Sequence, residues 1–138
     1  MAAASAEPLA IHRESPPELI GFRFRPATLF MSELLVFCTC PDADSARRIA
    51  DGLVEQHLAA CVNILPGVTS VYRWKGEVHH DQELLLMVKT RRERLDELKV
   101  HVVMQHPHEL PEIIAVEIAA GLDAYLSWIR AQTLAITE

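Results

Sequence analysis

The sequence lacks the short motifs by which several enzyme classes are recognised. It contains no Gly-rich phosphate loop, no Gly-x-Ser-x-Gly elbow and no His-Glu-x-x-His pair. The nearest string to the last motif runs from His108 to Glu112, and Pro111 interrupts it. Because proline breaks the helix on which two zinc-binding histidines converge, this string is not a zinc-protease motif. We therefore expect a protein that is not an enzyme.

Long apolar runs and paired cysteines are also missing. No apolar run approaches the roughly 18 residues that a membrane-spanning helix needs, so we expect no membrane contact. Cys38, Cys40 and Cys61 form no Cys-x-x-Cys pair, which argues against a disulfide framework or a zinc knuckle. A reducing compartment fits best, and we expect a cytoplasmic protein. The net charge of −6 makes nucleic acid an unexpected partner.

The first thirty residues differ from the rest of the chain. They show no sustained hydrophobic period and carry three prolines before position 20. We expect residues 1–30 to be a disordered or loosely attached extension. Met31 opens the first strongly patterned segment, so the mature chain starts either at Met1 or at Met31. Residues 31–138 have the length of a single domain.

Residues 60–90 form the most informative stretch. Two arms rich in apolar and β-branched residues flank Lys75-Gly76, which predicts a long antiparallel hairpin with a tight turn. A straight arm over residues 60–74 would span about 50 Å, at roughly 3.3 Å per residue. A compact chain of this length measures roughly 35 to 40 Å across. The hairpin must therefore bend, project or lie along another copy of the chain, and Pro66-Gly67 is the predicted bend.

The other segments surround this hairpin in a regular order. A strand over residues 33–40, apolar on both faces, precedes a helix capped by Asp42 or Asp44. Thr90 and Glu93 match a capping box, which predicts a second helix that begins at Arg91. A fourth strand over residues 112–118 and a short last helix after Gly121 follow. This order predicts an α+β, ferredoxin-like fold with an antiparallel sheet. One sheet face then needs a cover, which predicts self-association.

Two cysteines and two histidines are candidate metal ligands. Cys38 and Cys40 lie two residues apart on a strand and so point to one face. His106 and His108 flank Pro107 after the second helix. Thiolate and imidazole ligands suit copper or zinc. The alternative is that both cysteines are small buried hydrophobic residues and both histidines have capping or surface roles.

Three aromatic residues are candidate contacts between subunits. Tyr72 and Trp74 lie two apart near the tip of the hairpin, and Trp128 lies in the last helix. Aromatic anchors on a projecting arm suit an interface, and packing in an ordinary core is the alternative.

Five motifs occur in one order between Glu33 and Ile129: FCTCPDADSARRIA, AACVNILPGVTSVYRWKGEV, ELLLMVKT, HPHELPEIIAVEI and YLSWI. Together they resemble the CutA divalent-cation tolerance family. The resemblance implies a ferredoxin-like subunit in a homotrimer similar to that of the PII signal-transduction proteins, with the hairpin running onto neighbouring subunits. It also implies a role in tolerance of divalent cations, with copper as the first candidate for the bound ion.

The resemblance assigns roles to single residues. The metal-linked cysteine of the family matches Cys38, and the histidine of its His-Pro-Tyr motif matches His106. His108 stands where the family has tyrosine and is a candidate for a further ligand. Cys40 occupies a position with no expected ligand role.

A second hypothesis gives the trimer another function. It is a sensor or scaffold whose clefts between subunits receive a small anionic metabolite or a partner protein. Lys89, Glu109 and Glu112 would then be the recognition residues.

Overall fold

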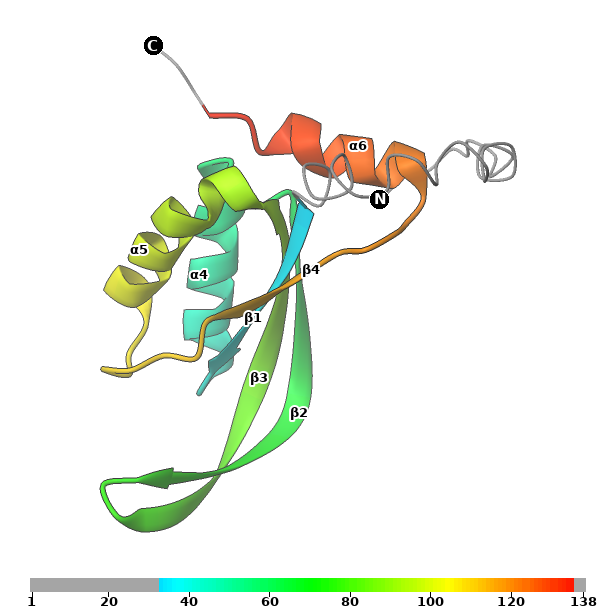
Figure 1. Ribbon diagram of the computed structural model, residues 1–138. Coiled ribbons are helices and arrows are strands. Elements are labelled where there is room, and N and C mark those ends of the chain that lie inside the picture. Colours follow the sequence, from blue (N-terminus) through cyan, green and yellow to red (C-terminus); the bar gives the residue numbers. More distant parts are fainter. Residues whose placement is uncertain (1–32, 136–138) are drawn as a thin grey trace.

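The computed structural model describes residues 33–135, so the predictions for residues 1–30 and Met31 lie outside it. The described elements are β1 (Glu33–Cys40), α4 (Ala43–Glu55), β2 (Cys61–Trp74), β3 (Glu77–Arg91), the 3₁₀ turn η1 (Arg92–Arg94), α5 (Leu95–Gln105), β4 (Ile114–Glu117) and α6 (Asp123–Gln132). Their strands pair antiparallel in the order β2-β3-β1-β4. Helices α4 and α5 lie against one face of this sheet (Figure 1). The predicted α+β, ferredoxin-like fold is confirmed.

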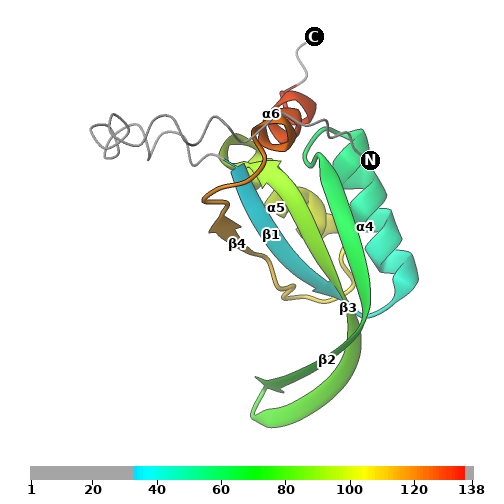
Figure 2. The ribbon, with the colours of Figure 1, turned by 90° about the vertical axis from the view of Figure 1, so that its right-hand side faces the viewer.

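The two faces of the central strand β1 are buried to different degrees. On the helix side, Leu34, Val36, Cys38 and Cys40 are all 2% exposed or less. On the opposite side, Leu35, Phe37 and Thr39 are half-buried. In Figure 2 the strands face the viewer and α4 and α5 lie behind them, while α6 lies near the end of the sheet. Among the described residues, no helix therefore covers the middle of this open face.

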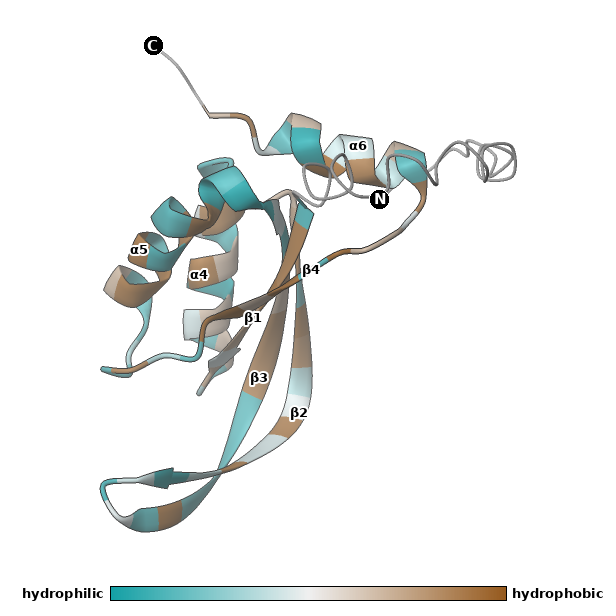
Figure 3. Cartoon of the chain, viewed as in Figure 1, coloured by the Kyte–Doolittle hydropathy of each residue, from teal (hydrophilic) through white to brown (hydrophobic). Residues whose placement is uncertain are grey.

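The hairpin of β2 and β3 has the predicted turn and the predicted bend. Lys75 and Gly76 both adopt positive φ, at 51° and 82°, as a two-residue hairpin turn requires. The pairing register shifts between Leu65 and Val68, so that Pro66 and Gly67 form a bulge. Beyond it the hairpin curls away from the sheet, and its colouring changes from mostly hydrophobic to mixed (Figure 3).

The bulge also reverses which side chains of β2 share a face with β3. Before it, Leu65 pairs with Leu85; after it, Val68 pairs with Glu83. Side chains alternate along a strand, so the extra residue moves the even-numbered residues of β2 to the face of Glu83. Tyr72 and Trp74 reach that face only because the bulge is present.

The predicted start of the second helix is wrong. Thr90 does not cap a helix: it is a buried residue of β3, and its hydroxyl donates to the Leu58 carbonyl oxygen at 2.7 Å. The strand continues through Arg91, and α5 begins only at Leu95, without a side-chain cap. The Thr90 hydroxyl bonds to the Leu58 carbonyl, and no side chain caps the turn that follows. The fourth strand is also shorter than predicted, since β4 covers only Ile114–Glu117.

Candidate metal centre

Two thiols and one imidazole meet between the end of β1 and the end of α5. A sulfur atom each from Cys38 and Cys40 and a ring nitrogen of His106 all lie within 4.8 Å of one another. All three residues are buried: Cys38 is 1% exposed, Cys40 0% and His106 8%. Within residues 33–135, this is the one set of three Cys, His, Asp or Glu ligand atoms that lies so close together.

The backbone explains why these side chains meet. The pleat of β1 points Cys38 and Cys40 to the helix side, opposite Leu86 and Leu84 of β3. His106 ends α5 in an extended conformation immediately before Pro107, which cannot continue the helix. Its ring therefore turns back toward β1, where Nε2 lies 2.7 Å from the Thr39 carbonyl oxygen.

Both nitrogens of the His106 ring have a hydrogen-bond partner. The backbone N–H of His108 donates to Nδ1 at 3.0 Å, so Nδ1 carries no proton. Nε2 therefore carries the proton of the neutral ring and donates to Thr39. A metal ion could reach either nitrogen only after one of these bonds is lost.

The two thiols perturb each other. The hydrogen bond between them raises the pKa of Cys38 far above its ordinary value, and burial and the nearby carboxylates of Glu112 and Glu83 raise it further. The same hydrogen bond lowers the pKa of Cys40. The two thiols thus interact as a pair in which Cys38 keeps its proton, and the Cys38 sulfur also lies 3.8 Å from the Thr39 carbonyl oxygen. The neighbouring carboxylates favour a cation at this place over a second thiolate.

The donor set fits a soft metal ion. Two metal–sulfur bonds of about 2.3 Å in line would separate the sulfur atoms by roughly 4.6 Å, and a bent arrangement by less. The observed limit of 4.8 Å allows both sulfurs to bind one ion with only small movements. Thiolates select copper(I) and zinc over hard cations. The cysteines are accordingly the main donors, and His106 is the third.

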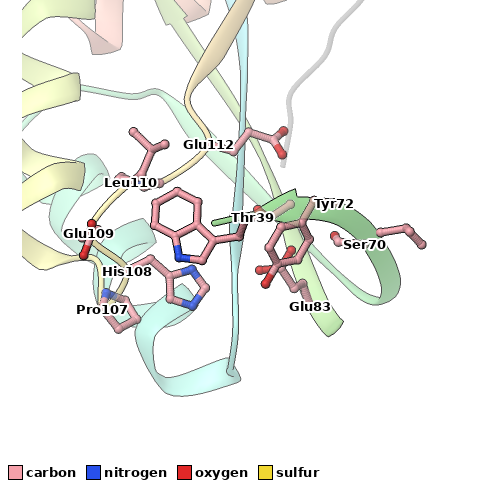
Figure 4. Close-up of a pocket in the computed structure, with 12 residues that line it drawn as sticks. Thr39, Ser70, Tyr72, Glu83, Pro107, His108, Glu109, Leu110 and Glu112 are labelled. Carbon is pink, nitrogen blue, oxygen red and sulfur yellow. The ribbon is translucent and has the colours of Figure 1, made fainter. Parts of the chain in front are cut away.

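The other predicted metal ligand, His108, lies outside this cluster. Its ring centroid is 5.1 Å from that of His106, but it lines a neighbouring hollow of about 740 Å³. Glu109 and Glu112 line the same hollow, which Figure 4 shows. Tyr72 and Trp74, predicted to contact a neighbouring subunit, line it as well.

Two further predicted residues lie elsewhere. The Nζ of Lys89 contacts the Asn63 side chain and lies 3.9 Å from the Cys61 sulfur. It is therefore separate from Glu109 and Glu112, with which it was grouped. Trp128 is half-buried in α6 and contacts Tyr125, with the two rings tilted by 36° and their centroids 5.4 Å apart.

Cys40 is the residue of the cluster that sequence reasoning left out. The signal was present, because a Cys-x-Cys string on a strand places both thiols on one face. The family pattern, which gives this position no ligand role, outweighed it.

Comparison with known proteins identifies the family. The family model described as CutA1 divalent ion tolerance protein matches residues 34–132, which covers the elements from β1 to α6 except for Glu33, the first residue of β1. The chain belongs to this family. The CutA1 family model therefore spans the thiol and imidazole cluster and the long hairpin alike.

Named CutA relatives support the assignment. The divalent-cation tolerance protein CutA of Thermus thermophilus is 54% identical over 101 residues, which cover 73% of this chain and 98% of that protein. The chloroplastic protein CutA of Arabidopsis thaliana is 40% identical over 113 residues, or 82% of this chain and 62% of that protein. The names of these relatives describe CutA and tolerance proteins and do not describe enzymes.

Solved CutA structures have the same fold. The Thermus thermophilus protein matches with a TM-score of 0.72 at 53% identity, over 73% of this chain and 98% of that one. The periplasmic CutA of Archaeoglobus fulgidus matches with a TM-score of 0.72 at 36% identity, over 74% of this chain and 99% of that one. CutA relatives thus include chloroplastic and periplasmic proteins. None of the helices that the structure describes in this chain is long and apolar enough to span a membrane.

Proposed function

We propose that this protein binds a thiophilic metal ion, copper foremost, through Cys38, Cys40 and His106, and that it contributes in this way to divalent-cation tolerance. One observation carries the proposal: three buried soft or borderline ligands converge within 4.8 Å of one another. Buried polar side chains normally satisfy one another or a ligand, and ligands of this kind suit copper and zinc.

The proposal ranks the three ligands. The polar partners of the thiols are each other, the Thr39 carbonyl oxygen, 3.8 Å from the Cys38 sulfur, and the Ser45 side chain beside Cys40. His106 already has two good hydrogen bonds. The cysteines therefore lose little when they bind a metal ion, whereas His106 must exchange a bond. His108 is at most an outer neighbour, because its backbone N–H orients the His106 ring.

The experiment is a competition titration of the reduced protein with copper(I), repeated with zinc. We expect Cys38→Ser and Cys40→Ser to weaken copper binding by more than the roughly 10- to 100-fold that loss of an outer partner costs. We expect His106→Gln to weaken it by about tenfold, at the lower end of that range.

The chain offers a matched control. Cys61 is a third cysteine that lies outside the cluster, so Cys61→Ser changes the thiol count without touching the site. We expect its copper affinity to equal that of the wild type. Equal affinities for Cys40→Ser and the wild type would remove the thiol pair from the account.

We also propose that the protein is a homotrimer, as the family resemblance implies. The open sheet face supports self-association, since Phe37, Leu85 and Met87 are half-buried there and no helix of the described residues lies over them. At the β4 edge, Ile114 and Val116 are 57% and 49% exposed. Native mass spectrometry measures subunit number and bound metal together, and a monomer at micromolar concentration would contradict this proposal.

The cytoplasmic location stays a prediction that rests on the unpaired cysteines. The hypothesis of an anionic ligand finds less support, because the hollow beside the metal centre is lined by Glu83, Glu109 and Glu112, with no Lys or Arg among its described lining residues. Repulsion between these carboxylates and an anion would oppose binding.

A further inference from the structure

The hollow contains a carboxylate that has no partner among residues 33–135. Glu83 of β3 is only 8% exposed and lines the hollow between the curled hairpin and the loop after α5. Among the described residues, no hydrogen bond or ion pair with its side chain is found. Figure 4 shows its side chain beside the Tyr72 ring, on the wall of the same hollow. The carboxylate faces the hollow, where a cationic group of a ligand would be its partner.

The rest of the charged lining points the same way. Glu109 and Glu112, both exposed, add two more carboxylates, and the only other titratable groups on the lining are Tyr72 and His108. The Tyr72 hydroxyl is already engaged, because it donates to Asp81. A cleft lined by charges of one sign concentrates ions of the opposite sign. The hollow thus attracts cations and repels anions.

A bare metal ion does not fit this hollow. Within the described chain, the one set of three ligand atoms within 4.8 Å of one another is the thiol and imidazole cluster. The carboxylates of the hollow are spread too widely to converge on one ion. Carboxylates that lie this far apart suit an organic cation that is longer than a single ion or whose charge is delocalised over several atoms.

Part of the wall is apolar and aromatic. Tyr72, Trp74 and Leu110 line the hollow, whose volume is about 740 Å³. Such a volume lies in the range of roughly 300 to 1,000 Å³ that small organic ligands occupy. Aromatic faces also attract cations, and the Lys75 ammonium already lies 5.6 Å from the centroid of the Trp74 ring. The bulge at Pro66-Gly67 brings both aromatic side chains to the face of Glu83.

We propose that this hollow binds a small organic cation, in which an ammonium or guanidinium group pairs with Glu83 and an aliphatic arm lies against Tyr72 and Trp74. The site is distinct from the metal centre, since Thr39 lines the hollow on one side of β1 and the two thiols lie on the other. The two sites still influence each other, because the carboxylates of Glu83 and Glu112 act electrostatically on Cys38.

The test compares two probes of equal shape by isothermal titration calorimetry. Butylguanidinium carries the charge, and butylurea is its neutral counterpart. We expect butylguanidinium alone to bind, and Glu83→Gln to weaken its binding by about tenfold or more, because a charge-assisted hydrogen bond is lost. Glu112→Gln, at an exposed position, should weaken binding less. Glu55→Gln removes the same charge from an exposed position of α4, away from the hollow, and should bind like the wild type.

Thermal unfolding without a probe gives a second readout. Because Glu83 has no partner among the described residues and shares the hollow with Glu109 and Glu112, Glu83→Gln should melt at no lower a temperature than the wild type near neutral pH. A lower melting temperature, or dissociation of the assembly, would show that Glu83 already pairs with a cation of the protein or of a second copy, and would overturn the proposal. Equal binding of both probes, or wild-type affinity in Glu83→Gln, would also overturn it.

Discussion

The two faces of β1 have similar residue types but are buried to different degrees. Leu34, Val36 and Cys38 alternate with Leu35, Phe37 and Thr39, and both sets are largely apolar. The first set is sealed under α4 and α5, whereas the second is half-buried. At the carboxyl end of the strand the helix side holds the soft thiol centre, and Thr39 on the other side lines a hard, acidic hollow. One strand thus separates two kinds of binding chemistry.

This difference shows what a closed layer and an open layer each provide. The closed side is dry, which protects thiols and strengthens their interactions with a metal ion. The open side leaves apolar surface that residues 33–135 do not cover, and such surface is normally an interface. The sealed face therefore carries the stability of the subunit, and we expect the open face to contribute chiefly to assembly.

The largest expected effect is on the sealed face. Leu86 is 0% exposed in the core, so Leu86→Ala should lower the free energy of unfolding by about 2 to 5 kcal/mol, from lost apolar contact and the cavity left behind. Urea unfolding at several protein concentrations measures the loss, which should not depend on concentration.

Leu85 is the matched control, because it is the same residue type one position earlier and on the open face. We expect Leu85→Ala to weaken subunit association more than it destabilises the subunit. Equal losses in both variants, with assembly unchanged, would contradict the distinction between the faces.

A smaller effect is expected in the helix layer that seals the closed face. A Cβ atom on Gly52 of α4 would lie 2.5 Å from Cε1 of His101 in α5. Overpacking of this kind costs roughly 1 to 3 kcal/mol, more than the roughly 1 kcal/mol that alanine gains over glycine in a helix. Gly52→Ala should therefore melt at a lower temperature than the wild type.

Gly121→Ala is the comparison for this variant. A Cβ atom on Gly121 would lie 3.2 Å from its nearest neighbour, a methyl carbon of Leu126, and that side chain can move. A Gly52→Ala protein at least as stable as Gly121→Ala would show that His101 yields easily and that the α4–α5 contact is loose.

The smallest effect is a pH dependence of the same contact. Burial lowers the pKa of His101 below its ordinary value of 6.5, against a hydrogen bond with the Ile49 backbone that raises it. The unfolded chain therefore takes up a proton more readily than the folded chain. Stability from this residue is complete above pH 6.5 and is lost as the pH falls below that value. The decrease in melting temperature between pH 7 and pH 5.5 should be smaller in His101→Gln, and an unchanged decrease would exclude His101 as its cause.

Much of the fold could be predicted because its signals are local. Lys75-Gly76 predicts the turn through its positive φ angles, and Pro66-Gly67 predicts the bulge. The start of α5 could not be predicted in this way, because Thr90 is held by Leu58, a residue 32 positions earlier in the chain. A capping box and a buried strand end have the same local sequence, and only the tertiary contact distinguishes them.

The candidate site was predicted in part for the same reason. The alternation of β1 places Cys38 and Cys40 on one face, but only the fold brings His106 to them from 66 or more positions away. The hollow was not predicted, because Glu83, Tyr72 and Glu112 meet only through the curl of the hairpin and the course of the loop after α5. Such a site leaves no spacing pattern in the sequence.

The central claim is that the sealed face of β1 holds a metal ion between two thiols. X-ray absorption spectroscopy at the copper edge tests it most directly, on the reduced protein loaded with one copper(I) per subunit. We predict two sulfur scatterers in the wild type and in Cys61→Ser, and one in Cys40→Ser. A first shell of nitrogen and oxygen alone, or an unchanged sulfur count in Cys40→Ser, would contradict it.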